Sequence, residues 1–368
     1  MENVVNLWQG RRVFLTGHTG FKGGWLALWL AKLGARVRGY ALDPSTEPNI
    51  FHVAEVGKSI EDVRGDILDR TKLEASLLDF APDIVFHLAA QPLVRRSYAD
   101  PLETYATNVM GTAHVLEAVR KSSSVRGVVS VTTDKCYENK EWIWPYREND
   151  PLGGYDPYSS SKACAELVCA SYRSAFFPVD RLDRHRVALA TARAGNVIGG
   201  GDWSSDRLVP DLIRGFVTRQ PVSIRRPNAI RPWQHVLEPL QGYIRLAEKL
   251  FDQQGQFASA FNFGPSDDGW PVWRIANRMA DSWGKDATWT LDAEPGVHEA
   301  GSLRLDSSKA RADLNWETPL GIEAAVQWTV DWYRAWHEGQ DMHLITTAQI
   351  DSYERLIVPP AANLTVRR

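Results

Sequence analysis

The chain has 368 residues, 44% hydrophobic and 24% charged, with a formal net charge of −3; this composition is typical of a globular protein and gives no basic surface for a nucleic-acid partner. Three cysteines, Cys136, Cys164 and Cys169, are too few and too clustered to staple a chain of this length, which indicates a reducing compartment. The N-terminal sequence lacks a secretory signal and no apolar run approaches the ~20 residues of a membrane span, so we expect a cytoplasmic protein without membrane contact.

The first half of the chain alternates short β-rich runs with helical segments. Strands are predicted at Arg12–Thr16, Arg36–Leu42, Ser59–Arg64, Asp83–Leu88 and Gly127–Thr132, and helices at Phe21–Leu33, Asp69–Phe80 and Pro101–Lys121. Asp69 suits a helix start because its carboxylate can cap free N–H groups, and Gly34 suits a helix end because it tolerates the left-handed conformation. The alternation predicts an α/β fold with a Rossmann-type doubly wound parallel sheet.

The second half has a looser pattern. A helix begins near Tyr158, a strand-like run covers Arg186–Val197, and a short strand at Ala260–Phe263 is expected to return to the main sheet. Further helices are predicted at Leu208–Thr218, Glu238–Phe251, Val272–Trp283 and Ile322–Trp336. We expect a Rossmann domain over 1–197 with the returning strand near 260–264, a smaller C-terminal α/β substrate lobe over 198–338 interleaved with it, and a loose C-terminal extension over 339–368.

A glycine-rich loop follows the first strand. It reads Gly17, His18, Thr19, Gly20, Phe21, Lys22 and Gly23, and a helix begins within it. Glycines at these positions allow a tight turn and a close approach of the backbone to a pyrophosphate, which the free N–H groups of the helix can bind. At the first strand-to-helix turn of an α/β pattern, the loop predicts a dinucleotide site.

Other residues at strand ends suit the same ligand. Asp43 lies near the place of the acid that binds the adenosine ribose, but the expected position itself is Ala41, so an ordinary turn residue is an equal alternative. Asp66 and Ile67 suit an adenine edge. Small residues that allow close backbone approach occur in Leu88, Ala89, Ala90 and Gln91.

Tyr158 and Lys162 are separated by four residues, which places both on one face of a helix. A neighbouring ammonium favours the phenolate, so Tyr158 could accept a hydroxyl proton. A surface pair is the alternative, but a second polar segment, Thr132, Thr133, Asp134 and Lys135, lies just upstream at the end of a strand. There the Thr133 hydroxyl could bind a sugar hydroxyl, and Asp134 could act as an acid if crowding raises its pKa.

Together these motifs resemble the extended short-chain dehydrogenase/reductase family over nearly the whole chain. The resemblance rests on the glycine loop, Asp66-Ile67, Ala89-Ala90, Asn108 with Gly111-Thr112, Tyr-x-x-x-Lys, and the run from Arg193 to Gly199. Within the family, the glycine loop, the stretch from Ala41 to Phe51 and Thr133-Asp134-Lys135 are most similar to the CDP-glucose 4,6-dehydratase branch. Related sugar-nucleotide dehydratases carry Glu at the position of Lys135.

The resemblance implies NAD as a cofactor that is regenerated in each turnover, with Asn108 and Thr132 among its contacts. Tyr158, assisted by Thr133 and Lys162, would remove the 4-hydroxyl proton of CDP-glucose during hydride transfer, and Asp134 would protonate the departing 6-hydroxyl. Lys135 would be either the carbon 5 base or an ammonium that orients Asp134. The product would be a 4-keto-6-deoxy sugar nucleotide for surface polysaccharide (lipopolysaccharide) synthesis.

The resemblance also implies a substrate site in the second lobe. Asn196 matches a diphosphate contact of the family. Arg231 and Arg304 are candidates for binding phosphate oxygens, and Arg207 with Leu208 for the nucleobase end; solvated surface arginines are the alternative. His298 could contact the substrate or be an ordinary loop residue. The nine histidines lack metal-ligand spacing, so no metal is expected. In the family, the helix after Pro101 and the helix carrying Tyr158 form a helix bundle, which implies a homodimer or homotetramer; packing on their own sheet is the alternative.

Two other functions fit the scaffold. A nucleotide-sugar 4-epimerase or reductase needs Tyr158 and Lys162 but no acid for eliminating water, so Asp134 argues against it. A non-catalytic dinucleotide sensor is disfavoured by the complete catalytic set. Asp43 would repel the 2′-phosphate of NADP, whereas His18 and Lys22 could favour it, and the sequence leaves the nucleobase open.

Overall fold

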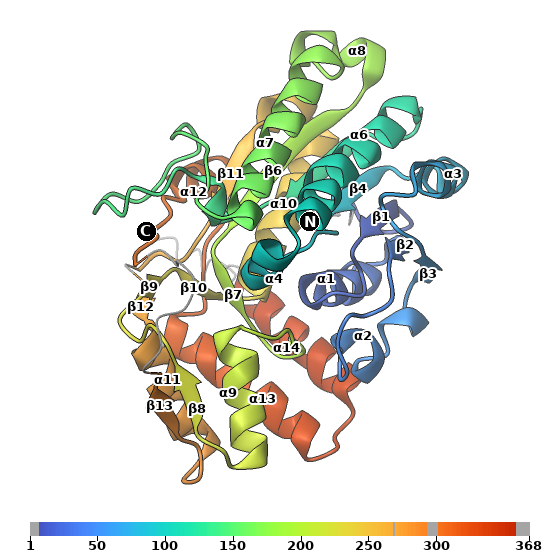
Figure 1. Cartoon of the computed structure of the whole chain (residues 1–368). Helices are drawn as coiled ribbons and strands as arrows, with labels where there is room; N and C mark the ends of the chain where they lie inside the picture. The colour runs from blue at the N-terminus through green and yellow to red at the C-terminus, as the bar shows by residue number, and fades with distance from the viewer. Residues whose placement is uncertain (1–6, 268, 293–300, 358–368) are drawn as a thin grey trace, which may run out of the picture.

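A seven-stranded parallel sheet forms the centre of the molecule (Figure 1). The computed structural model describes residues 7–267, 269–292 and 301–357, and the strand order is β11-β6-β5-β4-β1-β2-β3. The order reverses beside β1, and the carboxyl ends of the strands at such a point form the ligand-binding crevice of α/β sheets. The predicted doubly wound sheet is confirmed. Its strands are β1 (Arg12–Thr16), β2 (Arg36–Ala41), β3 (Glu61–Arg64), β4 (Ile84–His87), β5 (Gly127–Val131), β6 (Ala188–Ala194) and β11 (Ala260–Phe263).

The central strands are buried on both faces. Val13 and Leu15 of β1 belong to one hydrophobic core and Phe14 to another, because successive side chains point to opposite faces of a sheet. Helices α1 (Phe21–Lys32) and α10 (Leu237–Gln253) contribute to the first core. Helices α3 (Arg70–Phe80), α6 (Gly111–Lys121) and α7 (Pro157–Ala175) contribute to the second.

The predicted helix signals hold. Asp69 caps α3, since its Oδ1 accepts a hydrogen bond from Lys72 N at 3.0 Å, and Gly34 after α1 has a φ of 93°. The predicted helix Pro101–Lys121 consists of α5 (Pro101–Tyr105), a π-helical turn (Ala106–Met110) and α6. The remaining helices are α2 (Ile50–Val53), α4 (Val94–Ala99), α8 (Leu182–His185), α9 (Leu208–Thr218), α11 (Val272–Trp283), α12 (Ser308–Leu314) and α13 (Ile322–His337).

The predicted strand Arg186–Val197 is divided at Gly195. Strand β6 stays in the sheet, whereas β7 (Asn196–Ile198) leaves it to pair with β10 (Trp233–His235). A Cβ atom at Gly195 would lie 2.6 Å from Pro232 Cγ, so only glycine allows the two segments to pass. The returning strand β11 pairs with β6, as predicted. Besides β10, four short strands of the described chain were not predicted: β8 (Val222–Ile224) pairs with β13 (Trp289–Leu291), and β9 (Ile230–Arg231) with β12 (Trp270–Pro271).

The expectation of a loose segment after residue 339 is wrong for helix α14 (Met342–Ile357), which packs on α1 and α13. Trp29 Nε1 donates to Glu354 Oε1 at 2.8 Å, and the buried Tyr353 hydroxyl donates to Glu238 Oε2 at 2.9 Å. Lys32 of α1 also forms an ion pair with Asp351 at 2.8 Å. Helix α14, the last described element, is therefore held against α1, one of the first.

Candidate active site

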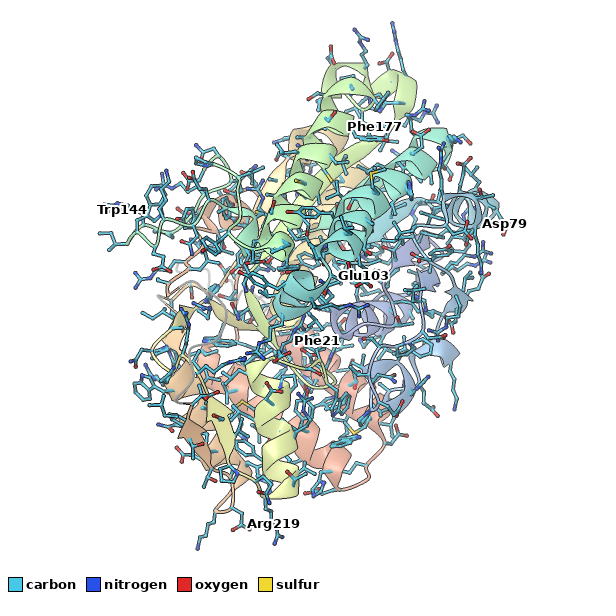
Figure 2. The ribbon with its side chains drawn as sticks, viewed as in Figure 1. Phe21, Asp79, Glu103, Trp144, Phe177 and Arg219 are labelled. Atoms are coloured by element: carbon cyan, nitrogen blue, oxygen red, sulfur yellow. The ribbon has the colours of Figure 1, made fainter. Side chains whose placement is uncertain are left out.

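The glycine loop lies at the carboxyl end of β1. Gly17 has a φ of 82°, and a Cβ there would lie 2.7 Å from Ala89 N, so the loop is held tightly against the end of β4. A Cβ at Gly20 would meet only Gly17 O, at 3.5 Å, which leaves that side of the loop open. Phe21, labelled near the middle of Figure 2, begins α1 and lies against Gly199, which follows β7. This loop has the shape of a cradle for a diphosphate.

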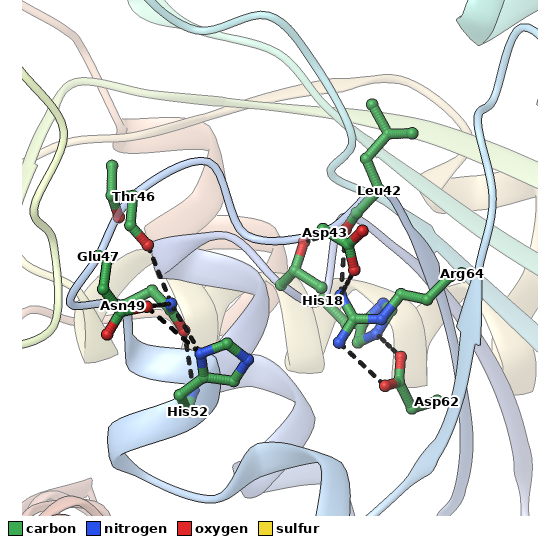
Figure 3. A network of polar contacts seen from close by, with 10 residues as sticks. His18, Leu42, Asp43, Thr46, Glu47, Asn49, His52, Asp62 and Arg64 are labelled. Atoms are coloured by element: carbon green, nitrogen blue, oxygen red, sulfur yellow. Dashed lines mark hydrogen bonds and ion pairs between the residues drawn. The ribbon is translucent and has the colours of Figure 1, made fainter.

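His18 points away from that open side. Its imidazole is fully buried against Gly39, and its Nε2 lies 2.7 Å from Asp62 Oδ1 (Figure 3). Burial lowers the pKa of His18, which its bond to Asp62 partly offsets. The side chain therefore braces the loop against β2 and β3. Thr19 braces it as well, since its hydroxyl donates to Leu42 O at 3.0 Å.

Asp43 lies just beyond the end of β2 in a charged cluster that includes Arg64 at the end of β3 (Figure 3). Arg64 lies 3.6 Å from Asp43 Oδ1 and 3.0 Å from Asp62 Oδ2, and its guanidinium stacks over Phe51 at 4.4 Å. Asp43 is 88% exposed. A ligand at the end of β2 would thus meet both a carboxylate and a guanidinium.

The segments after β3 and β4 are held by local hydrogen bonds. Asn108, in the π-helical turn, donates to Gln91 O at 3.0 Å and to Ser161 Oγ at 2.8 Å, and its Oδ1 accepts from Gln91 N at 2.8 Å. Asn108 thereby joins the loop of Leu88, Ala89, Ala90 and Gln91 to α7. Asp66 Oδ1 accepts from Leu68 N at 2.9 Å, and the Ile67 side chain packs beneath Gly111.

Tyr158 and Lys162 lie together on the buried face of α7, as predicted. Burial raises the pKa of Tyr158 to about 12, while a hydrogen bond with Thr133 and the charge of Arg207 oppose this rise. Lys162 Nζ donates to Val131 O at 3.3 Å, and burial lowers its pKa to about 8. The pair therefore faces the carboxyl end of β5 in a water-poor setting.

The predicted polar segment meets this pair. Thr132 follows β5, and Asp134 is 2% exposed, with Oδ1 accepting from Thr133 Oγ1 at 3.0 Å. Asp134 Oδ2 has no hydrogen-bond partner among the described residues. Burial raises the pKa of Asp134, although the charges of Lys135 and Arg231 oppose the rise. A buried carboxyl group with one oxygen available is suited to proton donation.

Lys22 points toward the same centre and not toward Asp43. Its Nζ lies 5.8 Å from the ring centroid of Tyr243, a fully buried residue of α10. Burial, together with the charges of Lys162 and Arg207, lowers the pKa of Lys22 to about 7. From the sequence we expected Lys22 to lie near the adenosine ribose, where it could favour a 2′-phosphate. The structure corrects this expectation, since the first turn of α1 directs the Lys22 side chain toward Tyr243.

The structure brings some predicted substrate residues to this centre. Arg207, just before Leu208 at the start of α9, forms an ion pair with Asp202 at 2.8 Å and interacts with the Tyr158 phenol. Arg231 Nη1 donates to Ile230 O at 3.0 Å, and the positive charge of Arg231 opposes the rise in the pKa of Asp134. Asn196 begins β7.

The two other predicted substrate residues are Arg304 and His298. The backbone of Arg304 pairs with Tyr146, whose N donates to Arg304 O at 2.9 Å. His298 lies outside the described residues. Within the described ranges, no helix is long and apolar enough to cross a membrane, and no group of three or more metal-ligating side chains occurs.

Sequence reasoning missed three residues near these groups: Arg64, Asp202 and Tyr243. Arg64 had a signal, because it ends a predicted strand adjacent to β2 and aligns with Ala41 in the sheet. Asp202 follows three glycines in the loop after β7, where an acid beside Arg207 could have been noticed. Tyr243 lies within an ordinary amphipathic helix and gave no signal.

Comparison with known proteins places these features in a family. The model of the NAD dependent epimerase/dehydratase family matches residues 13–264. A CDP-glucose 4,6-dehydratase of Salmonella typhimurium (strain LT2) is 52% identical over 95% of this chain and 97% of its own length. A UDP-glucose 4-epimerase of Mycolicibacterium smegmatis is 33% identical over 88% of this chain and 98% of its own length.

Solved structures share the fold. A UDP-glucose-4-epimerase from Stenotrophomonas maltophila, with bound NAD and formylated UDP-arabinopyranose, matches with a TM-score of 0.77 at 20% identity, over 89% of this chain and 99% of that one. At this identity the likeness concerns the fold alone. The family model and the two sequence relatives carry the assignment further: the chain belongs to the NAD dependent epimerase/dehydratase family.

Proposed function

We propose that this protein is an NAD-dependent 4,6-dehydratase that converts CDP-glucose to CDP-4-keto-6-deoxyglucose and water. The observation that carries the proposal is the 52% identity with the Salmonella CDP-glucose 4,6-dehydratase across nearly the full length of both chains. The arrangement of Tyr158, Lys162, Thr133 and Asp134 around the carboxyl end of β5 supports it, because oxidation and water elimination need a base and an acid side by side.

The dinucleotide site fits NAD. The open side of the loop at Gly20 and its tight contact at Gly17 suit a diphosphate, and Ala89 and Ala90 allow the backbone to lie close. We assign the contact with the adenosine ribose to Asp43 and the contact with the adenine edge to Asp66 and Ile67. NAD held there would supply the hydride acceptor for oxidation at carbon 4 and the hydride for reduction at carbon 6.

Tyr158 removes the proton of the 4-hydroxyl group during oxidation. Its buried phenol has a high pKa, so the reaction needs positive charge nearby. The charge of Arg207 opposes the rise in pKa, and we assign the same role to Lys162 when it is protonated. Thr133 assists by hydrogen bonding to the phenol, since this bond favours the phenolate. Together the three residues lower the free energy of the transition state for proton transfer.

Asp134 then protonates the departing 6-hydroxyl group. Burial keeps this carboxyl group protonated at a higher pH than an ordinary aspartic acid, and its free Oδ2 can face the substrate. The carbon 5 proton, made acidic by the 4-ketone, needs a base. Lys135 adjoins Asp134 and serves either as that base or as the ammonium that orients Asp134.

Residues outside the sheet domain bind the nucleotide diphosphate. Arg231 and Arg207 both carry their charge close to the catalytic groups, so the diphosphate enters from the side of β9 and α9. Asn196, at the start of β7, contacts the same diphosphate, and Leu208 lines the nucleobase end. The elements after Gly199 that lie outside the sheet and its covering helices thus form the substrate lobe, to which we also assign Arg304.

We also propose that the protein is a homodimer or homotetramer that pairs through α7 and the helical segment Pro101–Lys121 beside it. Large apolar side chains are exposed there, which is costly unless they are covered. They are Leu102 (80% exposed), Met110 (51%) and Leu167 (58%). Sedimentation of the wild type and of Leu102→Glu tests this: the variant should sediment at half the mass or less, and an unchanged mass would contradict the pairing surface.

The experiment that tests the activity is mass spectrometry of the protein with NAD and, in parallel, CDP-glucose, dTDP-glucose, UDP-glucose and GDP-mannose. Loss of one water from CDP-glucose alone, without net NADH, is the expected result. An isomerised sugar nucleotide of unchanged mass, detected by chromatography, would instead identify an epimerase. Binding of NAD without turnover of any sugar nucleotide would identify a sensor.

A further inference from the structure

A buried ion pair lies behind the catalytic segment. Glu166 of α7 and Arg193 of β6 are 3% and 4% exposed, and Arg193 Nη2 lies 2.8 Å from Glu166 Oε2. The charge of Arg193 and its hydrogen bond lower the pKa of Glu166 against the effect of burial, so the carboxylate is ionised. Burying such a pair costs desolvation free energy and adds little net stability to the fold, so stability alone does not account for the pair.

The pair holds both ends of the segment that carries Thr133, Asp134 and Lys135. On one side, the Thr132 hydroxyl donates to Glu166 Oε1. On the other side, Arg193 Nη1 donates to the Tyr137 hydroxyl at 2.9 Å. The Tyr137 hydroxyl in turn donates to Asn262 Oδ1 of β11 at 2.6 Å. Thr132, just before the catalytic segment, and Tyr137, two residues after it, are therefore fixed to one charged pair.

Glu166 also acts on Lys162, which lies one helical turn before it on α7. The carboxylate is among the groups that raise the pKa of Lys162 against the lowering effect of burial. The ionisable groups that interact with Lys162 come from α7 and from three other elements. They are Cys169 and Glu166 of α7, Cys136 of the turn after β5, Lys22 of α1, and His87 of β4. Among the groups that act on Lys162 itself, Glu166 is the one held ionised by its own ion pair.

We propose that Glu166 and Arg193 are positioning residues for the reaction: the pair fixes the segment of Thr133, Asp134 and Lys135 at both ends, and the carboxylate keeps Lys162 an ammonium. Only the kinetic part of this inference rests on the proposed dehydratase activity. We assign neither residue a contact with the substrate or the cofactor, because both are almost fully buried and bind Thr132 and Tyr137.

The test compares Glu166→Gln with the control Thr191→Val. The control removes a second hydrogen bond to the carboxylate, from Thr191 Oγ1 to Glu166 Oε2 at 2.8 Å, and leaves its charge in place. The side-chain pKa of Lys162 is measured by NMR of ¹³C-labelled lysine, with the signal assigned through Lys162→Met. We expect Glu166→Gln to lower this pKa by roughly one or more, and the control to leave it near the wild-type value.

Kinetics with CDP-glucose and NAD supply the second measurement. Since the ammonium is required, the alkaline limb of the kcat profile should move to lower pH in Glu166→Gln, and kcat at its optimum should fall roughly ten- to a hundredfold because the segment loosens. KM for CDP-glucose should change little. The Thr191→Val profile should coincide with that of the wild type.

An unchanged Lys162 pKa together with an unchanged pH profile would overturn the proposal, even if Glu166→Gln were less stable. If Glu166→Gln does not fold, the double variant Glu166→Met with Arg193→Met replaces the pair by apolar side chains and carries the same expectations. A wild type that does not dehydrate CDP-glucose would refute the proposed function, whereas the NMR titration would still decide the role of Glu166.

Discussion

Replacing Lys22 by methionine should stabilise the protein in a way that depends on pH. Burial and two neighbouring cations lower the pKa of Lys22 from 10.5 to about 7, so the folded state binds its proton less tightly than the unfolded chain. At about 1.4 kcal/mol for each pH unit, this difference corresponds to roughly 5 kcal/mol of lost stability. The loss is complete below pH 7, shrinks as the pH rises through the folded-state value, and vanishes near pH 10.5.

Methionine keeps the apolar stem against Tyr243 and removes only the charge. Local relaxation and the lost cation–π contact reduce the gain, so we expect Lys22→Met to be about 1–3 kcal/mol more stable than the wild type at pH 6.5. Urea unfolding of both proteins at pH 6.5, 8 and 9.5, without NAD, measures the difference. A gain that does not shrink with rising pH, or a loss of stability at pH 6.5, would refute the reasoning.

Three further predictions follow from the same structure. Tyr158→Phe should abolish water loss from CDP-glucose yet bind NAD in calorimetry, whereas a variant of its exposed neighbour, Tyr155→Phe, should remain active; activity in Tyr158→Phe would remove the proposed base. Asp43→Asn removes the carboxylate that repels a 2′-phosphate and leaves Arg64 available to bind it. The preference for NAD over NADP, measured as the ratio of the two Kd values, should therefore fall roughly tenfold. An unchanged ratio would contradict the assignment of Asp43 to the ribose. Burial raises the pKa of Glu238 from 4.5 to about 8, so the wild type should lose stability from pH 5 to 8 relative to Glu238→Gln, and equal urea midpoints at both pH values would show otherwise.

Much of the sheet follows from local pattern. The strand Arg12–Thr16 is apolar and ends in a glycine loop, and the structure has the same bounds. The break at Gly195 could not be predicted, because its cause is Pro232, which lies far along the chain and packs against it. Helix α14 was missed for a similar reason: its partners Trp29 and Glu238 lie 325 and 115 residues before the residues of α14 that they bind.

The same limit applies to the candidate site. The spacing of Tyr158 and Lys162 on one helix was sufficient to predict that they lie side by side, since helix geometry alone fixes it. The directions of His18 and Lys22 were not predictable from their shared loop. His18 turns toward Asp62 and Lys22 toward Tyr243, because one precedes the helix and the other lies in its first turn.

The contacts of helix α14 bear on how the chain acquires its structure during synthesis. Helix α1 is made early, yet the indole of Trp29 and the ammonium of Lys32 find their partners on a helix more than 300 residues later. A nascent chain can therefore assemble the parallel sheet on the ribosome, but the outer side of α1 stays uncovered until Met342–Ile357 has emerged. During that interval an apolar surface is open to chaperones, so the abundance of the protein in a cell should respond to changes in α14 even where catalysis does not.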